Sequence, residues 1–417
     1  MIRRLRRLPD DLRGLARLAT DATVGTTDLV EAVHAQFTLR RSTRQIGRRR
    51  GISGFVYRTV RRVARVSGWG AETALLPLAR LVREDRDAPT SHRREALVAV
   101  LNGILGDGLD ATGNPLAIPM RFRRGGAVLP LTPERLRTAL PNATPDVLVL
   151  LHGLCMNDLE WTTAAGHDHG AALERDAGLT AVYLHYNSGR HISTNGHDFA
   201  DLLGQLVDAW PVPVRSLTFL CHSMGGLVAR SAVAVAPPDA PWRQALQRIV
   251  FLGTPHHGSP AERAGNRLDR LLVRTRWTAP FSHLGHIRSA GITDLRYGFL
   301  LDSDWRWRDR FEARADPRTP VPLPTDVDTY AIAATAAAAT GTLVDRFVGD
   351  GIVPVASASG SHADSRHALA FAADRVHVAL GVHHFGLLGP EVYGVLLRWL
   401  GSPPQPSEAM AERPSGA

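Results

Sequence analysis

Residues 219–226, Phe-Leu-Cys-His-Ser-Met-Gly-Gly, have the pattern of a buried strand that enters a tight turn at Ser223 and continues as an apolar helix. A serine hydroxyl becomes a useful nucleophile when such a strained turn lifts it above a sheet edge, beside a base and at a helix N-terminus. The turn requires small residues two positions before and after the serine. Gly225 meets this requirement, and Cys221 stands where glycine is usual. The pattern predicts that Ser223 is a nucleophile on a strand-to-helix elbow.

A second strand pattern precedes the elbow by about seventy residues. Residues 146–151 form an apolar run typical of a buried parallel strand, and His152-Gly153-Leu154 follows it. A glycine at this point lets the backbone turn so that the next amide faces a developing oxyanion. We therefore expect the amide of Leu154 and that of Met224, directly after the nucleophile, to form an oxyanion hole.

An acid and a base follow in the order expected for this arrangement. Asp350 lies between two glycines before an apolar segment, and the pair His383-His384 precedes the last predicted helix. The pattern favours Asp350 as the acid and His384 as the base. Adjacent side chains point in different directions, so only one of the two histidines can face Ser223, and His383 stays an alternative. The alternative acids are Asp302, Asp304 and Asp345.

Taken together, five motifs resemble the serine lipases and esterases of the α/β-hydrolase superfamily, in particular the bacterial lipase and GPI inositol-deacylase-like group. They are His-Gly-Leu, Cys-His-Ser-Met-Gly-Gly, Leu-Gly-Thr-Pro-His-His-Gly-Ser at 252–259, Gly-Asp-Gly-Ile-Val-Pro-Val, and His-Phe-Gly-Leu-Leu. The resemblance covers residues 145–400. It implies that Ser223 is the nucleophile, Asp350 the acid and His384 the base, with oxyanion donors at Leu154 and Met224.

The same resemblance implies a reaction. It indicates a serine carboxylester hydrolase that forms an acyl-enzyme on a hydrophobic or lipid ester and needs no cofactor or metal. Acyl transfer and thioester hydrolysis on the same triad are close variants. A non-catalytic membrane-tethering protein that keeps a hydrolase-like scaffold is the alternative from another class.

The order of elements predicts the fold class. Strands and helices alternate after residue 145, which indicates an α/β-hydrolase fold with a mostly parallel sheet and helices on both faces. We expect a basic helical N-terminal extension at 1–110, a hydrolase domain at 111–401 and a disordered tail at 402–417. Aromatic residues including Trp277, Trp305 and Trp307 predict a lid-like insertion at about 260–325. The expected helices of the extension span 2–20, 26–40, 54–66, 71–84 and 92–105, and a hairpin is expected within 120–132.

Charge is concentrated in the extension. The chain has a formal net charge of +9 and contains no lysine, and residues 1–68 hold 16 arginines against five acidic residues. Leucines at intervals of three and four make the first segment an amphipathic helix. Such a helix can either lie on an anionic membrane or pack on the hydrolase domain. Nucleic-acid binding is not favoured, because no base-stacking or reading motif accompanies the arginines.

Other features restrict the class of protein. No apolar run approaches the roughly 20 residues of a membrane-spanning helix, and the N-terminus lacks the apolar core of a secretion signal. We expect a cytoplasmic protein with possible peripheral membrane contact. The only two cysteines, Cys155 and Cys221, exclude a disulfide framework. His167-Asp168-His169 is too small a set for a metal site, since no third ligand is identifiable.

Overall fold

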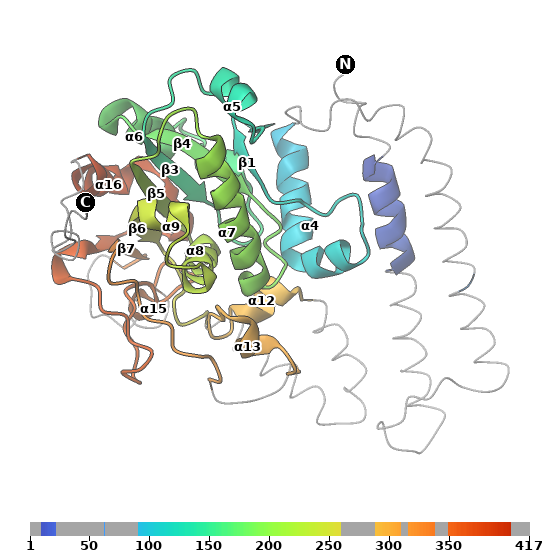
Figure 1. The fold of residues 1–417 in the computed structure, drawn as a ribbon. Coiled ribbons are helices and arrows are strands. Elements are labelled where there is room, and N and C mark those ends of the chain that lie inside the picture. The colour runs from blue at the N-terminus through green and yellow to red at the C-terminus, as the bar shows by residue number, and fades with distance from the viewer. Residues whose placement is uncertain are drawn as a thin grey trace.

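A computed structural model of the protein describes residues 10–21, 62, 91–259, 288–309, 316–337 and 349–401. Its centre is one mixed sheet with helices on both faces (Figure 1). The predicted α/β-hydrolase fold class is confirmed by this arrangement.

Eight strands form the sheet, in the order β2-β1-β4-β3-β5-β6-β7-β8. Neighbours from β4 to β8 pair in parallel, whereas β1 pairs antiparallel with β2 and β4. The carboxyl ends of β3 to β8 therefore meet at one edge of the sheet. Their bounds are β1 Arg121–Arg124, β2 Ala127–Val128, β3 Asp146–Leu151, β4 Thr180–His185, β5 Ser216–His222, β6 Leu246–Leu252, β7 Asp328–Thr335 and β8 Val376–Leu380.

The strands are buried on both faces, because their side chains alternate between two hydrophobic clusters. In β3, Val147, Val149 and Leu151 enter one cluster while Leu148 and Leu150 enter the other. The first cluster includes residues of α5, α7 and α8, and the second includes residues of α6 and α16. Continuous apolar runs are what a parallel sheet covered on both faces requires.

The helices that matter for the site are α4 His92–Ala111, α5 Pro133–Ala139, α6 His169–Ala177, α7 Ile192–Ala209, α8 Met224–Val235 and α16 Tyr393–Leu400. Shorter helices are α9 Pro241–Ala245, α12 Ala290–Asp294, α13 Asp302–Trp305 and α15 Val355–Ala358. The 3₁₀ turns are η2 Asp158–Trp161, η4 Ala373–Arg375, η5 His384–Leu388 and η6 Pro390–Val392.

Most predicted elements of the sheet are confirmed. The predicted hairpin is β1 and β2, and its turn is at Gly125-Gly126, where both residues have positive φ. The helix predicted at 92–105 continues to Ala111 in α4. The predicted helices at 26–40 and 71–84 lie outside the described residues. The same holds for the aromatic segment around Trp277 and for the predicted helix at 54–66, of which only residue 62 is described.

Residues 10–21 form a helix that lies beside α4 (Figure 1). Arg94 of α4 forms a bidentate ion pair with Asp11, and Arg17 donates to the carbonyls of Thr112 and Gly113. Gly14 faces Leu116 so closely that a Cβ there would lie 2.4 Å from Leu116 Cγ. This helix therefore packs on the rest of the protein.

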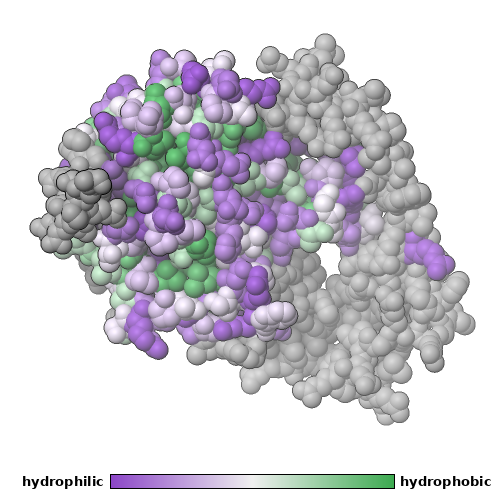
Figure 2. Space-filling model, in the orientation of Figure 1, coloured by the Kyte–Doolittle hydropathy of each residue, from purple (hydrophilic) through white to green (hydrophobic). Residues whose placement is uncertain are grey.

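The regularly spaced leucines of this helix lie in two different environments. Leu18 packs against a small cluster that contains Val98 and Leu109 of α4, while Leu12 and Leu15 are 41% and 49% exposed. Among the described helices, none is both long and apolar enough to cross a membrane. In the view of Figure 2, the described surface is mainly hydrophilic, and hydrophobic residues form small patches between polar ones.

Candidate active site

Ser223 occupies a strained turn between β5 and α8. Its backbone angles are φ 54° and ψ −125°, which a non-glycine residue rarely adopts. Gly225 is required at this turn, since a Cβ there would lie 2.5 Å from the carbonyl oxygen of Leu151 and 2.7 Å from that of His152. The turn at Ser223 thus lies directly against the end of β3.

His384 and Asp350 are brought together by the structure. His384 Nδ1 lies 2.7 Å from Asp350 Oδ2, and both side chains are buried. The other carboxylate oxygen, Oδ1, accepts hydrogen bonds from the amides of Ile352 and Val353 at 3.0 and 2.7 Å. A carboxylate held in this way keeps Nδ1 protonated and leaves Nε2 of His384 as the proton acceptor.

The end of β6 holds both the serine and the histidine. The amide of Ser223 donates to the carbonyl of Leu252 over 2.8 Å. The next residue, Gly253, has φ 58°, and a Cβ on it would lie 3.1 Å from Cε1 and Nδ1 of His384. On the other side, His222 Nε2 lies 3.3 Å from the carbonyl oxygen of His384. His222, the neighbour of Ser223, and Gly253 therefore both contact His384.

The alternative candidates lie elsewhere. The side chain of His383 is exposed, and its Nδ1 accepts from the amide of Gly386. Asp302 accepts from Ser193 and Arg306, and Asp304 accepts from the amides of Leu300, Leu301 and Thr319. The third alternative acid, Asp345, lies outside the described residues.

The two expected oxyanion donors are Met224, which directly follows Ser223, and Leu154, which follows Gly153. Met224 is the first residue of α8, where helix geometry leaves the amide without an intrahelical acceptor. Leu154 lies in the loop at residues 152–158, here called the β3 loop. A Cβ on Gly153 of this loop would lie 3.0 Å from Ser223 Cβ. The β3 loop and Ser223 are thus in direct contact. The oxyanion hole expected at Leu154 and Met224 stays a prediction.

Two further histidines, His152 and His222, pack within the turns that make this contact. The ring of His152 stacks on Tyr186 with a centroid separation of 4.3 Å, and the hydroxyl of Tyr186 donates to the carbonyl of His152. Burial lowers the pKa of His152 to about 3 and lowers the pKa of His222 well below its usual value. Both rings are therefore neutral at pH 7, and their contacts hold the turns without adding charge.

The segment His167-Asp168-His169 contributes by packing. His169 Nε2 lies 3.0 Å from the carbonyl oxygen of Leu387, which belongs to η5 together with His384. His167 Nε2 lies 2.8 Å from His169 Nδ1, and Asp168 caps α6. No group of His, Cys, Asp and Glu residues within the described residues could hold a metal ion. The motif anchors the turn that carries His384, a role that sequence reasoning missed.

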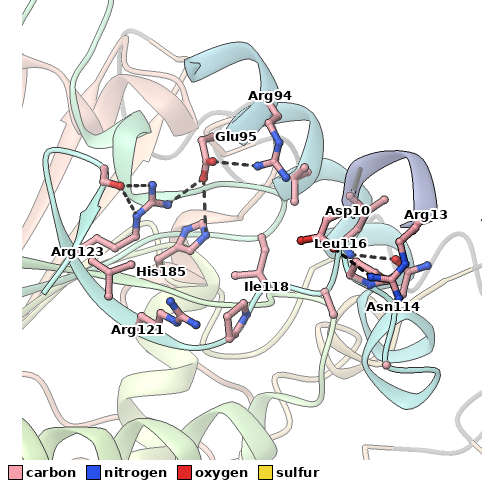
Figure 3. Close-up of a pocket in the computed structure, with 17 residues that line it drawn as sticks. Asp10, Arg13, Arg94, Glu95, Asn114, Leu116, Ile118, Arg121, Arg123 and His185 are labelled. Atoms are coloured by element: carbon pink, nitrogen blue, oxygen red, sulfur yellow. Dashed lines mark hydrogen bonds and ion pairs between the residues drawn. The ribbon is translucent and has the colours of Figure 1, made fainter. Parts of the chain in front are cut away.

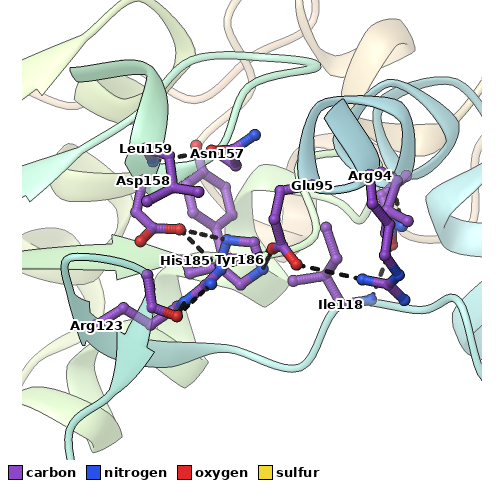
Figure 4. A network of polar contacts seen from close by, with 12 residues as sticks. Arg94, Glu95, Ile118, Arg123, Asn157, Asp158, Leu159, His185 and Tyr186 are labelled. Carbon is purple, nitrogen blue, oxygen red and sulfur yellow. Dashed lines mark hydrogen bonds and ion pairs between the residues drawn. The ribbon is translucent and has the colours of Figure 1, made fainter. Parts of the chain in front are cut away.

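A buried network of charges includes Asp158, the last residue of the β3 loop (Figure 4). Arg123 of β1 donates to Glu95 of α4 and to Asp158 at the end of the β3 loop, both at 2.9 Å. His185 Nδ1 lies 3.1 Å from Asp158 Oδ1. This network could not be predicted from the sequence, because its members are separated by up to ninety positions and have no motif spacing.

A cavity of about 520 Å³ lies beside this network, between helix 10–21, α4 and β1 (Figure 3). Glu95, Arg123 and His185 form one wall, and residues 115–119 form an apolar wall. None of Ser223, Asp350 and His384 lines it.

Polar residues after β4 connect elements near the site. Asn187 donates to the carbonyl of Gly106, and Arg190 pairs with Asp110 and Asp198. The ring of His191 stacks on Trp305 at 3.6 Å between centroids. These contacts bind α4 and the described part of the predicted insertion to the end of β4.

Residues 144–321 match the family model described as "PGAP1-like alpha/beta domain". The matched segment begins just before β3 and contains the elbow. Together with the sheet and the elbow, this match confirms the predicted resemblance to the α/β-hydrolase superfamily. The chain has no match among curated proteins.

Solved structures of esterases and lipases are also similar to this chain at low identity. The mature lipase BlEst2 of Bacillus licheniformis is 17% identical, with a TM-score of 0.40, and the match covers 61% of this chain and 91% of the lipase. The Pyrococcus furiosus esterase Pf2001 is 13% identical with a TM-score of 0.34, covering 63% and 83% respectively. A Pyrobaculum calidifontis esterase is 13% identical with a TM-score of 0.36, covering 76% and 94%. Identities this low carry no information about substrate.

Proposed function

We propose that the protein is a serine carboxylester hydrolase that acts through Ser223, His384 and Asp350. The observation that carries the proposal is the 2.7 Å contact between His384 Nδ1 and Asp350 Oδ2 beside a serine at φ 54°. An imidazole with its Nδ1 fixed by a buried carboxylate serves as a general base at neutral pH.

The proposed reaction has two halves. Ser223 Oγ attacks the ester carbonyl carbon while His384 Nε2 takes its proton, and the amides of Leu154 and Met224 stabilise the oxyanion. Collapse of the intermediate breaks the bond to the alcohol, which leaves with the proton from His384. Water activated by His384 then hydrolyses the acyl-enzyme, releasing a carboxylic acid and restoring Ser223.

A hydrophobic ester is the proposed substrate class. Two large apolar side chains are exposed directly beside the catalytic pair: Phe385 is 53% exposed and Ile352 is 42% exposed. The Phe385 ring lies 5.6 Å from the His384 ring between centroids. An apolar rim of this kind supports contact with an acyl chain or a lipid surface.

The test uses the purified full chain and p-nitrophenyl esters of acetic and lauric acid. We expect hydrolysis by the wild type, and its loss in Ser223→Ala without a change in thermal unfolding. Ser216→Ala is the matched control, since Ser216 begins β5 and bonds Asp146 at the opposite end of the strand. Wild-type activity in Ser223→Ala would reject the mechanism. Product formation only with an added alcohol acceptor would instead indicate acyl transfer.

A further inference from the structure

Helix α4 touches the β3 loop at very short range. A Cβ on Gly103 would lie 2.2 Å from Sγ of Cys155 and 2.9 Å from both its Cα and its amide nitrogen. Separations below about 3 Å are not tolerated between such atoms, so the α4 backbone is in van der Waals contact with the loop backbone. Cys155 directly follows Leu154, the residue whose amide is the proposed oxyanion donor.

Cys155 is held in an unfavourable conformation by contacts on both sides. Its φ of 60° lies in the left-handed region that non-glycine residues avoid. Its amide donates to Ser188 Oγ over 3.1 Å, and Ser289 Oγ donates to the carbonyl of Gly103 over 2.6 Å. The loop is therefore clamped between α4 and the residues that follow β4.

The next residue on the same face of α4 repeats this close approach. Gly106 lies three positions after Gly103, and a Cβ on it would lie 1.9 Å from Asn187 Oδ1. Asn187 is buried and donates to the carbonyl of Gly106. Two glycines on one face thus allow α4 to reach both the β3 loop and the loop after β4.

The first turn of α4 holds the other end of the β3 loop. Glu95 is 3% exposed and accepts from Arg123, which also donates to Asp158 at the end of the loop (Figure 4). Removing one member of a buried ion network leaves the others with unpaired charge, so these contacts fix geometry strongly.

We propose that α4 is a positioning element of the oxyanion hole. Gly103 and Glu95 hold the β3 loop at its two ends, so that the amide of Leu154 keeps its direction toward the substrate carbonyl beside Ser223. The inference rests on the proposed function. It makes part of the predicted N-terminal extension necessary for catalysis, although α4 lies before the matched residues 144–321.

The test compares two glycines of the same helix in the full chain. Gly103→Ala forces the β3 loop to move, and since losing one oxyanion donor costs about 10²–10³ in kcat, we expect a fall of at least about tenfold with little change in KM. The pH dependence of kcat should stay unchanged, because His384 and Asp350 are not touched. Gly108→Ala is the matched control, since a Cβ there meets nothing within 4 Å. Its kcat should equal that of the wild type.

A second substitution tests the mechanism of the loss. Cys155→Gly removes the sulfur that the new methyl group meets and suits the left-handed φ of that position. Gly103→Ala combined with Cys155→Gly should therefore recover part of the kcat lost in Gly103→Ala. Recovery of this kind is not expected if Gly103→Ala merely destabilises α4.

A variant at the other end of α4 is available if Gly103→Ala does not fold. Glu95→Gln should lower kcat by about threefold or more with KM retained, while Glu174→Gln serves as its control. Glu174 of α6 pairs with Arg124, which is the residue of β1 next to Arg123. Wild-type kcat in folded Gly103→Ala or Glu95→Gln would overturn the role of α4. Absence of ester hydrolysis in the wild type would instead reject the proposed function itself.

Discussion

The carboxylate of Asp350 bonds His384 through one oxygen and two backbone amides through the other, with Nδ1 and Oδ2 2.7 Å apart. In the proposed reaction, this geometry orients the imidazole and stabilises its protonated form. In Asp350→Asn we expect kcat to fall by about 10⁴-fold, because an amide can present its NH₂ group to Nδ1 and select the wrong tautomer. Asp302→Asn should keep nearly full activity. Near-normal turnover of Asp350→Asn would mean that another carboxylate is the acid.

The two adjacent histidines should differ sharply in their contributions. His384→Ala removes the base, so kcat for ester hydrolysis should fall by several orders of magnitude, up to about 10⁶-fold. His383→Ala removes an exposed ring whose Nδ1 accepts from Gly386, and activity should change by less than about tenfold. Steady-state kinetics of both variants check this difference. The reverse ranking would assign the base to His383.

Stability should fall in weakly acidic solution because of buried neutral histidines. Burial lowers the pKa of His169 to about 4 from its ordinary value of 6.5. Between these two values the unfolded chain binds a proton that the folded chain does not, so the free energy of unfolding falls as pH drops from 6.5 toward 4. One such group contributes at most about 1.4 kcal/mol per pH unit.

Urea unfolding at pH 7 and pH 5 checks this linkage. His169→Gln should be less stable than the wild type at pH 7, since its contact with the Leu387 carbonyl is altered, but it should lose less stability between pH 7 and pH 5. An equal loss in the two proteins would show that His169 titrates normally in the folded state.

Contact of the basic extension with a membrane stays a prediction. It can be tested separately from the packing of helix 10–21 on the rest of the protein. Each basic residue near an anionic surface contributes about 1 kcal/mol, so replacing the first four arginines by glutamine should weaken sedimentation with anionic vesicles in a salt-dependent way. Hydrolysis of a short soluble ester should not change. These residues are Arg3, Arg4, Arg6 and Arg7. Equal sedimentation of variant and wild type would reject the tether.

Deletion of residues 1–21 should act differently, because helix 10–21 is bonded to α4 through Asp11 and to the residues directly after α4 through Arg17. We expect a lower thermal midpoint in this deletion. An unchanged midpoint would show that the helix contributes nothing to folding.

The sequence predicts the strands and the turn at Ser223 well because both have local signatures. Continuous apolar runs identify buried parallel strands, and the elbow requires small residues at fixed positions around Ser223. The contacts that hold the β3 loop in place could not be predicted in this way. Glu95 meets Arg123 through tertiary packing, and Gly103 meets Cys155 fifty-two positions later. A glycine in a helix sequence does not indicate which neighbouring residue occupies the space that a side chain would fill.

The motif at 167–169 shows a different limit. The spacing of its two histidines suggests a metal site. In the fold, however, His169 donates a hydrogen bond to the carbonyl of Leu387, in the turn that carries His384, over two hundred positions away. Only the three-dimensional neighbourhood distinguishes a ligand set from a structural contact of this kind.

Covalent labelling tests whether Ser223 is an activated nucleophile without knowledge of the substrate. The full chain is incubated with a fluorophosphonate, digested, and the modified peptide is mapped by mass spectrometry. We expect one phosphonylated residue, Ser223, with labelling abolished in Ser223→Ala and strongly slowed in His384→Ala. Modification of a different serine, or labelling of Ser223 at the same rate in His384→Ala, would contradict the account.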